Sequence, residues 1–294
     1  NCLLYFADRV SLKNGRCEIL QVTGTDEHHP FVDNDAYTNY SVHYGFKRFL
    51  KLCDELEYQI PQAVREEFAD ILNNLYLPKL ENGLIPQFDG YFELNRELEV
   101  QGSGTHKNFQ MKNTGLYHKS QIIKQPDVIL LYTYLNVGLD RESYALNWDY
   151  YENLCEASSS LTYSPHAIAS ADNDRMLSFH NYFLKAIKVD VDDIFEVGWQ
   201  GVHSGCLAGG YIAVLRGIFG IELDSEGKLN VNPRGMPFWK KVAARFFHMG
   251  TLFEISLESE TVKIELLQGR PQTLFVYGCP WLIEREISFK CKKV

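Results

Sequence analysis

The feature that most constrains the fold of this chain is a change of hydrophobic period near residue 222. After that point apolar and polar residues alternate in short runs bounded by turn residues, as at 228–233, 253–258, 261–266 and 284–289. Such alternation is typical of half-buried antiparallel strands. Before that point apolar residues recur at helical spacing in seven segments, at 36–58, 62–77, 125–137, 141–153, 159–172, 175–189 and 205–219. The sequence therefore predicts a mainly α region over 1–222 and a small antiparallel β-sheet domain over 223–294.

The charge of the chain excludes two classes of partner. It has 29 basic and 38 acidic residues, a formal net charge of −9, whereas nucleic acids and anionic membranes attract clustered Lys and Arg. The longest apolar runs, such as 128–131 and 212–215, are far shorter than the ~20 residues of a membrane-spanning helix. We therefore expect neither nucleic acid nor a membrane as the partner.

Cysteine and histidine usage indicates a reducing compartment and no metal site. The seven cysteines are scattered and form no Cys-x-x-Cys pair, which argues against both a zinc ribbon and a disulfide framework. The adjacent His28 and His29 are poor ligands for one ion, because neighbouring side chains diverge and a tetrahedral site needs further ligands. The sequence therefore predicts a cytoplasmic protein without a bound metal.

A long polar segment covers residues 99–120 and contains several glycines, among them Gly102, Gly104 and Gly115. A loop of this length without secondary structure is uncommon inside a compact domain, and such loops are often functional. We expect this segment to be a functional loop.

The densest polar cluster lies at 23–35, directly before the first helical segment. It holds four carboxylates and two histidines, including Asp26 and Glu27. Loops that carry such groups on a rigid scaffold are where catalytic residues concentrate. For Asp33 and Asp35 the favoured interpretation is instead a helix N-cap, because Asp is a preferred residue there.

A second cluster, Lys124-Gln125-Pro126-Asp127, opens a strongly apolar helix. A cation beside an amide at a helix start can bind a polyhydroxylated or anionic ligand. Taken alone, the cluster is better explained by Pro126 in a first helical turn, Asp127 favourable to the helix dipole, and a solvated Lys124.

A third cluster, at 201–210, combines glycines with His203, Ser204 and Cys206 at the start of a helix. Backbone N–H groups at such a start can bind an anion closely. The Gly-Lys-Ser/Thr ending of a Walker loop is missing. The alternatives are a helix of small residues packed closely against a neighbour and, for Cys206, an inert core thiol in preference to a nucleophile. The serine run 158–160 is equally typical of a helix N-cap.

The order of these clusters resembles that of a known family. The segment 23–40, which contains Thr-Asp-Glu-His-His and Val-Asp-Asn-Asp-Ala-Tyr-Thr-Asn, resembles the Gly-Pro-Asp-Glu-Tyr-His and Val-Asp-Asn-Asn-Ala-Tyr-Thr-Asn motifs of the inverting disaccharide phosphorylases of glycoside hydrolase family 65. That family includes maltose, kojibiose, nigerose and trehalose phosphorylases. Four later segments resemble its downstream motifs in the same order, at 86–91, 124–128, 159–161 and 201–209.

The resemblance implies an (α/α)₆ toroid, of which this chain would hold the C-terminal half, followed by the β-sheet domain. It also implies a missing N-terminal half, comprising a β-sandwich and the first part of the toroid, and a homodimer. We therefore expect the 294-residue chain to be inactive by itself.

The resemblance also implies roles for single residues. Glu27 falls on the general acid, and Lys124 and Gln125 fall on positions that contact the sugar. Asp26 is then a structural or substrate-contacting partner of Glu27. Inorganic phosphate is implied as a co-substrate, and no cofactor is implied. The residues implied to hold phosphate are Ser159, Ser160, His203, Ser204 and Cys206. The implied reaction is inverting phosphorolysis of an α-linked glucosyl disaccharide to β-D-glucose 1-phosphate and a free acceptor sugar. For its role Glu27 must hold a proton, and we expect burial and the neighbouring Asp26 to favour that form.

The sequence departs from the family pattern at several positions. The family commonly has Pro at Thr25, Tyr at His28, His-Asp/Glu at residues 157–158 and Ser at Cys206. Two alternatives therefore stay open. If a second carboxylate such as Glu156 or Glu196 faced the site, the chain would belong to an inverting hydrolase. The third interpretation is a non-catalytic, sugar-binding fragment.

Overall fold

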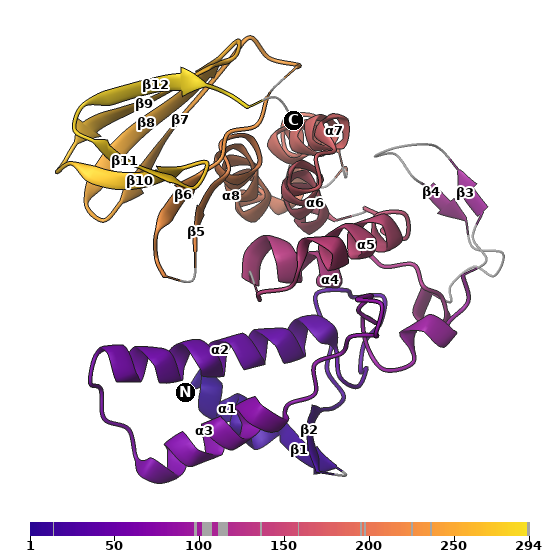
Figure 1. Ribbon diagram of the computed structural model, residues 1–294. Helices are drawn as coiled ribbons and strands as arrows, with labels where there is room; N and C mark the ends of the chain where they lie inside the picture. Colours follow the sequence, from indigo (N-terminus) through magenta and orange to yellow (C-terminus); the bar gives the residue numbers. More distant parts are fainter. Residues whose placement is uncertain are drawn as a thin grey trace. The chain divides into compact units, whose positions relative to one another are not determined.

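The computed structural model describes residues 1–292 except 14, 97–98, 102–107, 111–116, 136, 158, 195, 197, 225 and 236, and gives only the backbone of 99–101, 108–110 and 200. The chain forms two compact units, Asn1–Pro165 and His166–Val294 (Figure 1). Each unit is described by itself. Among the described residues no helix is both long and apolar enough to cross a lipid bilayer.

The N-terminal part of the first unit is a layer of three helices beside a hairpin. The helices are α1 (Cys2–Arg9), α2 (Ala36–Glu55) and α3 (Gln62–Asn74), and the hairpin pairs β1 (Val10–Lys13) with β2 (Arg16–Ile19). Burial of apolar side chains at helical spacing holds these elements together, in a core that contains Ala7, Cys17, Ile19, Val42, Phe46, Phe68, Ile71 and Leu75. This layer fixes the first residue of α2, directly after the 23–35 cluster.

The rest of the first unit carries the second polar cluster. Helix α4 (Asp127–Leu130) continues as a π-helical turn, η3 (Leu131–Leu135), and contacts α2 and α5 (Arg141–Tyr151). Asp140 caps α5, since its carboxylate accepts the Ser143 N–H at 2.6 Å. Helix α6 (Ser160–Asp172) begins in this unit and contains Pro165.

The segment expected to be a loop without secondary structure contains a short hairpin. Its strands are β3 (Glu99–Gln101) and β4 (Asn108–Gln110), which pair antiparallel, and the 3₁₀ turns η1 (Tyr91–Glu93) and η2 (Tyr117–Lys119) flank it. The expectation for 99–120 was therefore partly wrong, because backbone pairing of the two strands satisfies part of the segment. Its glycines at 102, 104 and 115 lie outside the described residues.

In the second unit α7 (Met176–Lys188) packs on α8 (Ser204–Ile212). The 3₁₀ turn η4 (Gly198–Gln200) precedes α8, and α8 continues as η5 (Ala213–Ile218). A Cβ on Gly210 would lie 2.9 Å from Ile187 Cγ2, and one on Gly217 would lie 2.6 Å from the Phe179 ring. Both glycines are therefore needed for close packing, and the small-residue interpretation of this helix is confirmed for its second half.

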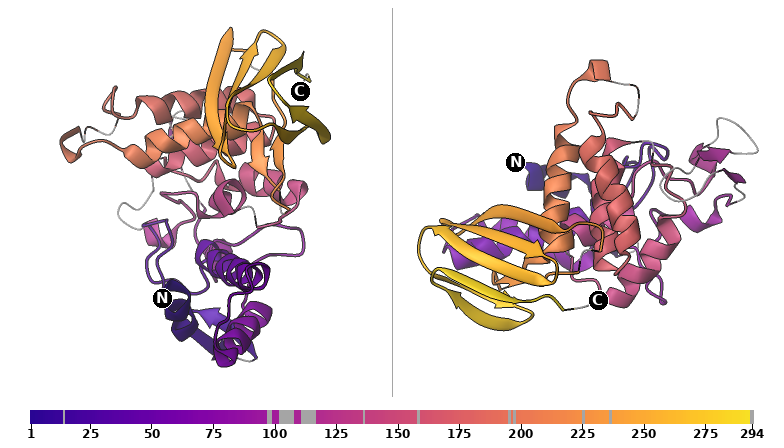
Figure 2. Two further views of the ribbon diagram at one scale, coloured as in Figure 1. Left: turned by 90° about the vertical axis from the view of Figure 1, so that its left-hand side faces the viewer. Right: turned by 90° about the horizontal axis from the view of Figure 1, so that it is seen from above.

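Two four-stranded sheets follow, drawn in orange to yellow in Figure 2. One has the order β11-β10-β6-β5 and the other β12-β9-β8-β7. All pairs are antiparallel except β6 with β10, which is parallel. The strands are β5 (Ile221–Leu223), β6 (Leu229–Val231), β7 (Lys241–His248), β8 (Thr251–Glu258), β9 (Thr261–Gln268), β10 (Gln272–Val276), β11 (Cys279–Ile283) and β12 (Glu286–Lys290). The alternation read from the sequence is visible in β8, where Phe253, Ile255 and Leu257 are buried.

Each of the seven predicted helical segments contains a helix, and each predicted strand overlaps an observed one. The division of the chain into compact units falls at Pro165, not at 222, because the sheets and helices α7 and α8 belong to the same unit. Arg234 links the segment after β6 to the helices of this unit. Its guanidinium donates to the carbonyls of Arg216 and Gly217 at 2.8 and 3.0 Å and contacts Asp172 at 3.1 Å. The domain boundary at 222/223 stays a prediction.

Candidate active site

The first polar cluster is built around the buried carboxylate of Asp26. Its Oδ1 accepts the Lys124 N–H at 2.8 Å and the His28 N–H at 3.1 Å, and its Oδ2 accepts from Gln87 Nε2 at 2.8 Å. We call residues 23–29 the acid loop. Asp26 therefore joins the acid loop to the segment that precedes α4 and to the 86–91 motif.

His29 adds a charged partner to Asp26. Its Nδ1 lies 2.6 Å from Asp26 Oδ2 and its Nε2 lies 2.8 Å from the carbonyl oxygen of Ser120, and both side chains are buried. Because a carbonyl and an ionised carboxylate can only accept, both ring nitrogens must carry protons. Burial alone would raise the pKa of Asp26, but hydrogen bonds from His29, the Lys124 amide and Gln87 outweigh it and hold that pKa below its ordinary value.

Glu27 lies at the surface, next to the buried hydrogen-bond network of Asp26 and His29. Its carboxylate forms an ion pair with Lys124 Nζ and lies 3.5 Å from Gln125 Nε2, while its N–H donates to Gln125 Oε1 at 3.3 Å. The Glu27 side chain is 62% exposed and Lys124 is 28% exposed. The expected burial of Glu27 was therefore wrong in this chain. The structure does bring Glu27 together with Lys124 and Gln125, which are about a hundred residues away in the sequence.

Ser159 belongs to the same group, because Gln125 Nε2 lies 3.4 Å from its Oγ. Ser160 is the first residue of α6, and the Ser159 Oγ accepts the Leu161 N–H at 3.3 Å. Ser159 therefore caps α6, as the alternative interpretation of the serine run predicted, whereas residue 158 lies outside the described residues. Ser159 also faces the amide beside Glu27, so the two interpretations are compatible.

His28 points toward a second carboxylate. Its Nε2 lies 2.9 Å from Glu156 Oε2, the Tyr117 hydroxyl donates to Glu156 Oε1 at 3.3 Å, and the His28 and Tyr117 rings stack with centroids 4.2 Å apart. Burial and the nearby Glu156 raise the pKa of Tyr117. Glu156 thus lies beside the acid loop, whereas Glu196 is exposed in the other unit.

Two more carboxyl groups lie behind the acid loop. Asp35 caps α2, as predicted, by accepting the Thr38 N–H at 2.7 Å. Asp127, the first residue of α4, accepts the Thr25 N–H at 3.0 Å and the Thr25 hydroxyl. Burial raises the pKa of both groups, that of Asp127 well above its ordinary value. The charge of Asp26 raises both further, and the charge of Asp35 raises the pKa of Asp127, whereas a hydrogen bond with Asp127 lowers that of Asp35. Asp33 does not cap a helix but accepts from the backbone and side chain of Gln21 at the surface.

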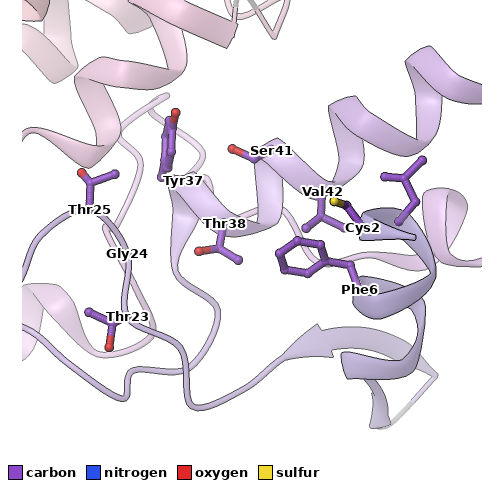
Figure 3. Close-up of a pocket in the computed structure, with 10 residues that line it drawn as sticks. Cys2, Phe6, Thr23, Gly24, Thr25, Tyr37, Thr38, Ser41 and Val42 are labelled. Atoms are coloured by element: carbon purple, nitrogen blue, oxygen red, sulfur yellow. The ribbon is translucent and has the colours of Figure 1, made fainter. Parts of the chain in front are cut away.

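A cavity of about 370 Å³ borders the acid loop at Gly24 and Thr25. Figure 3 shows the hydroxyl groups of Thr25, Tyr37 and Ser41 toward one end and the apolar Phe6 toward the other. The ten residues that line it do not include Glu27, Lys124 or Gln125. The cavity therefore adjoins the loop without containing the predicted sugar-binding side chains.

The third cluster lies in the second unit, at the start of α8. His203 is the N-cap residue, and both its backbone N–H and its Nδ1 contact the Asp190 carboxylate, at 3.0 and 2.5 Å. The hydrogen bond from the His203 ring lowers the pKa of Asp190. Ser204, Gly205 and Cys206 form the first turn of α8. The Ser204 N–H donates to the Val202 carbonyl at 2.9 Å, whereas the helix itself supplies no acceptor for the N–H groups of Gly205 and Cys206. This start can therefore bind an anion.

Cys206 takes part in this turn only through its backbone. Its thiol is buried and lies 3.5 Å from the Ala186 carbonyl, and burial raises the pKa of the thiol to about 11. Such a thiol is neither a nucleophile nor a donor to an external anion. The inert core interpretation describes its side chain.

Sequence reasoning missed several members of the acid-loop network. Ser120, which anchors His29, and Tyr117, which stacks on His28, lie at the end of the polar segment 99–120, in which no pattern distinguishes single residues. Gln87 lies in the 86–91 motif, which was noted only for its resemblance. Within the described residues no group of His, Cys, Asp and Glu has the arrangement of a metal site.

Comparison with solved structures defines the class of fold. A solved chain from the human microbiome, provisionally named a kojibiose phosphorylase, superposes with a TM-score of 0.87 at 19% identity and covers 99% of this chain and 45% of its own. The expected fold class, part of an (α/α)₆ toroid followed by a β-sheet domain, is thus confirmed. Residues 3–212 match the glycosyl hydrolase family 65 central catalytic domain and residues 223–282 match the C-terminal domain of that family. The chain belongs to glycosyl hydrolase family 65.

Curated relatives are phosphorylases. The chain is 51% identical, over 97% of its length, to 3-O-alpha-D-glucosyl-L-rhamnose phosphorylase of Lachnoclostridium phytofermentans. It is 30% identical over 87% of its length to kojibiose phosphorylase of Caldanaerobacter subterraneus, and 27% identical over 91% to nigerose phosphorylase of L. phytofermentans. It spans 39%, 35% and 38% of the length of these three relatives.

Proposed function

We propose that this chain supplies the proton donor and a phosphate-binding helix start to an inverting phosphorylase that cleaves an α-linked glucosyl disaccharide. The products would be β-D-glucose 1-phosphate and the free acceptor sugar. The observation that carries the proposal is the position of Glu27, which is exposed on a buried, cross-linked loop and is contacted by Lys124 and Gln125. The names of the curated relatives support the same class of reaction.

Glu27 would act as general acid and protonate the departing glycosidic oxygen. In this structure the Glu27 carboxylate is paired with the Lys124 ammonium group. Lys124 must therefore leave this carboxylate when substrate binds, and a sugar hydroxyl or an anion would be its new partner. In this scheme Lys124 and Gln125 bind the sugar, and Asp26 acts through its hydrogen bonds to the loop.

Inorganic phosphate would be the nucleophile, which needs to be positioned but does not need a general base. The start of α8 is the proposed phosphate site, with His203 held by Asp190 and backbone N–H groups from the first turn. Ser159 and Ser160 are proposed as further ligands. No cofactor enters this scheme. The homodimer and the cytoplasmic location stay predictions.

An inverting hydrolase is the second candidate, because Glu156 lies beside the acid loop and is held by His28 and Tyr117. In that case Glu156 would activate water while Glu27 protonates the leaving group. The two candidates differ in their need for phosphate, and this difference is measurable.

The experiment uses a chimera in which this chain replaces the matching 39% of the L. phytofermentans relative. Cleavage of α-1,1, α-1,2, α-1,3 and α-1,4 glucosides is followed with and without phosphate, starting with 3-O-α-D-glucosyl-L-rhamnose. We expect phosphate-dependent cleavage and a β sugar phosphate. Cleavage that is unchanged without phosphate would favour the hydrolase, and cleavage by the 294-residue chain alone would contradict the expected need for an N-terminal half.

A further inference from the structure

Two buried carboxyl groups converge on one glycine of the acid loop. A Cβ built on Gly24 would lie 2.2 Å from Asp127 Oδ2 and 2.6 Å from Asp35 Oδ2. The two Oδ2 atoms thus occupy the same small volume behind the loop. Asp35 and Asp127 are 1% and 0% exposed, so water does not screen them from each other.

The groups that face this pair do not include a cation among the described contacts. Asp127 accepts from the backbone and hydroxyl of Thr25, and Asp35 accepts from the Thr38 N–H. The other titratable groups nearby are Asp26 on the acid loop, which already has His29 as its partner, Tyr37 on α2 and Tyr151 on α5. Burial raises the pKa of both tyrosines, so they are neutral at physiological pH.

Two carboxylates this close, buried and without a cation, cannot both be ionised, because desolvation and mutual repulsion each favour the protonated form. We propose that Asp35 and Asp127 hold one proton between their Oδ2 atoms, and that this shared proton positions the acid loop and therefore Glu27. As an account of how Glu27 is positioned, this rests on the proposed function. The shared proton itself follows from the geometry alone.

The link from the pair to Glu27 is short. Both hydrogen bonds of Thr25 end on Asp127, and Thr25 lies two residues before Glu27. Asp35 at the start of α2 provides the fixed side of the link. Loss of the proton would place two like charges behind Gly24, and the loop could relieve their repulsion only by moving away. Asp35 and Asp127 are positioning residues, since neither is placed to touch substrate.

The test is a titration of the ¹³Cγ signals of aspartate in the full 294-residue chain. We expect Asp35 and Asp127 to keep one proton at pH 7 and to lose it in one coupled step at higher pH. The amide signals of Thr25 and Glu27 should shift in that same step. In Asp35→Asn the amide oxygen can keep the Thr38 N–H while an amide N–H replaces the shared proton, so this step should vanish while the loop signals stay near their wild-type positions. Asp127→Asn provides a second variant in which the step should also vanish, but the Thr25 amide signal should shift, because the Nδ2 that replaces Oδ2 cannot accept the Thr25 N–H.

The matched control is Asp33→Asn, which changes a partly exposed carboxylate of the same cluster and should leave the coupled step in place. Two fully ionised carboxylates at pH 7 would overturn the shared proton. A coupled step that leaves the Glu27 amide unmoved would overturn the positioning role. These readouts need no turnover, so a chimera without phosphorolysis would disprove the proposed function and leave this inference standing.

Discussion

The acid loop and the start of α8 present their functional groups in different ways. Behind Glu27, the carboxyl groups of Asp26, Asp35 and Asp127 are fully buried and receive hydrogen bonds from several separate segments. At α8, by contrast, the side chains of His203 and of its partner Asp190 are 22% and 23% exposed. The first region is a buried, hydrogen-bonded network behind Glu27, and the second is a partly solvated helix start.

The contrast corresponds to two kinds of chemical task. A general acid must place one proton against one oxygen, and errors of about 1 Å can cost about 100-fold in rate. An anion at a helix start is held by charge and by several N–H groups that tolerate small shifts. The comparison suggests that changes at the acid loop act on turnover and stability, whereas changes at α8 act on phosphate affinity.

The largest expected effect is that of Glu27→Gln in the chimera. Removal of a general acid should lower kcat by about 10²- to 10⁴-fold, because glutamine cannot deliver a proton to the leaving group. Steady-state phosphorolysis with saturating phosphate measures it. Glu156→Gln is the matched control and should retain phosphate-dependent cleavage. If instead Glu27→Gln retained full activity, the chain would be the non-catalytic fragment of the third interpretation.

Asp26→Ala should cause the largest loss of stability. It removes the buried carboxylate partner of His29 and leaves the donors of Lys124 and Gln87 without their acceptor, and breaking a buried pair in this way costs about 3–5 kcal/mol. Urea unfolding of the 294-residue chain at pH 7 measures the change. Asp190→Ala removes the corresponding carboxylate at α8 and should cause a much smaller shift of the midpoint, because water can solvate His203 there. Equal shifts for the two variants would refute the contrast between the regions.

The pH dependence of stability should have one sign for Asp26 and the opposite sign for the pair Asp35 and Asp127. Asp26 has a pKa below its ordinary value, so its contribution is present above the unfolded-state pKa of about 4 and is lost as the pH falls through the lower folded value. Asp35 and Asp127 have raised values, so their contribution is present at low pH and is lost as the pH rises through the folded values. When the unfolding midpoint is plotted against pH, its decrease at acid pH should therefore become smaller in Asp26→Asn. Its decrease with rising pH should become smaller in Asp127→Asn. Profiles that change in the reverse sense would contradict both assignments.

The helices could be predicted because apolar spacing repeats over long segments such as 36–58 and 175–189. Several short elements were missed, and for α1 and β7 the reason is identifiable. Helix α1 is only eight residues long, and β7 contains Ala243, Ala244 and Arg245 in a run that is weakly alternating. The parallel pairing of β6 with β10 joins strands about forty residues apart, and no local pattern encodes such a pairing.

The candidate site was predictable only where its groups are local in sequence. Asp26, Glu27 and the capping Asp35 could be found because the acid loop is dense in polar residues before a helix. The interpretation of Asp127 as a residue that favours the helix dipole missed its burial, since its partner Thr25 lies 102 residues away. The exposure of Glu27 was also missed, because local sequence does not tell which carboxylate of an adjacent pair points inward.

At α8, His203→Ala should weaken phosphate binding with little loss of stability. A hydrogen bond to a charged group contributes about 1.5–3 kcal/mol, so the KM for phosphate in the chimera should rise about 10- to 100-fold while kcat changes less. Asp190→Asn should act in the same direction, because it removes the carboxylate that orients the His203 ring. A fall in kcat with unchanged phosphate KM would place His203 outside the phosphate site.

The smallest expected effect is that of Cys206→Ala. This variant tests whether phosphate is bound by the backbone N–H groups at the start of α8 or by the Cys206 thiol. The thiol faces the Ala186 carbonyl and has a pKa of about 11, so at pH 8 only about one molecule in a thousand carries a thiolate. Alkylation should therefore reach the exposed Cys2 and Cys279 long before Cys206. Because a backbone N–H does not depend on its side chain, the phosphate KM of the variant should match that of the parent chimera. A raised KM would mean that the thiol itself contacts the anion, and α8 would then have to present side chains as the acid loop does.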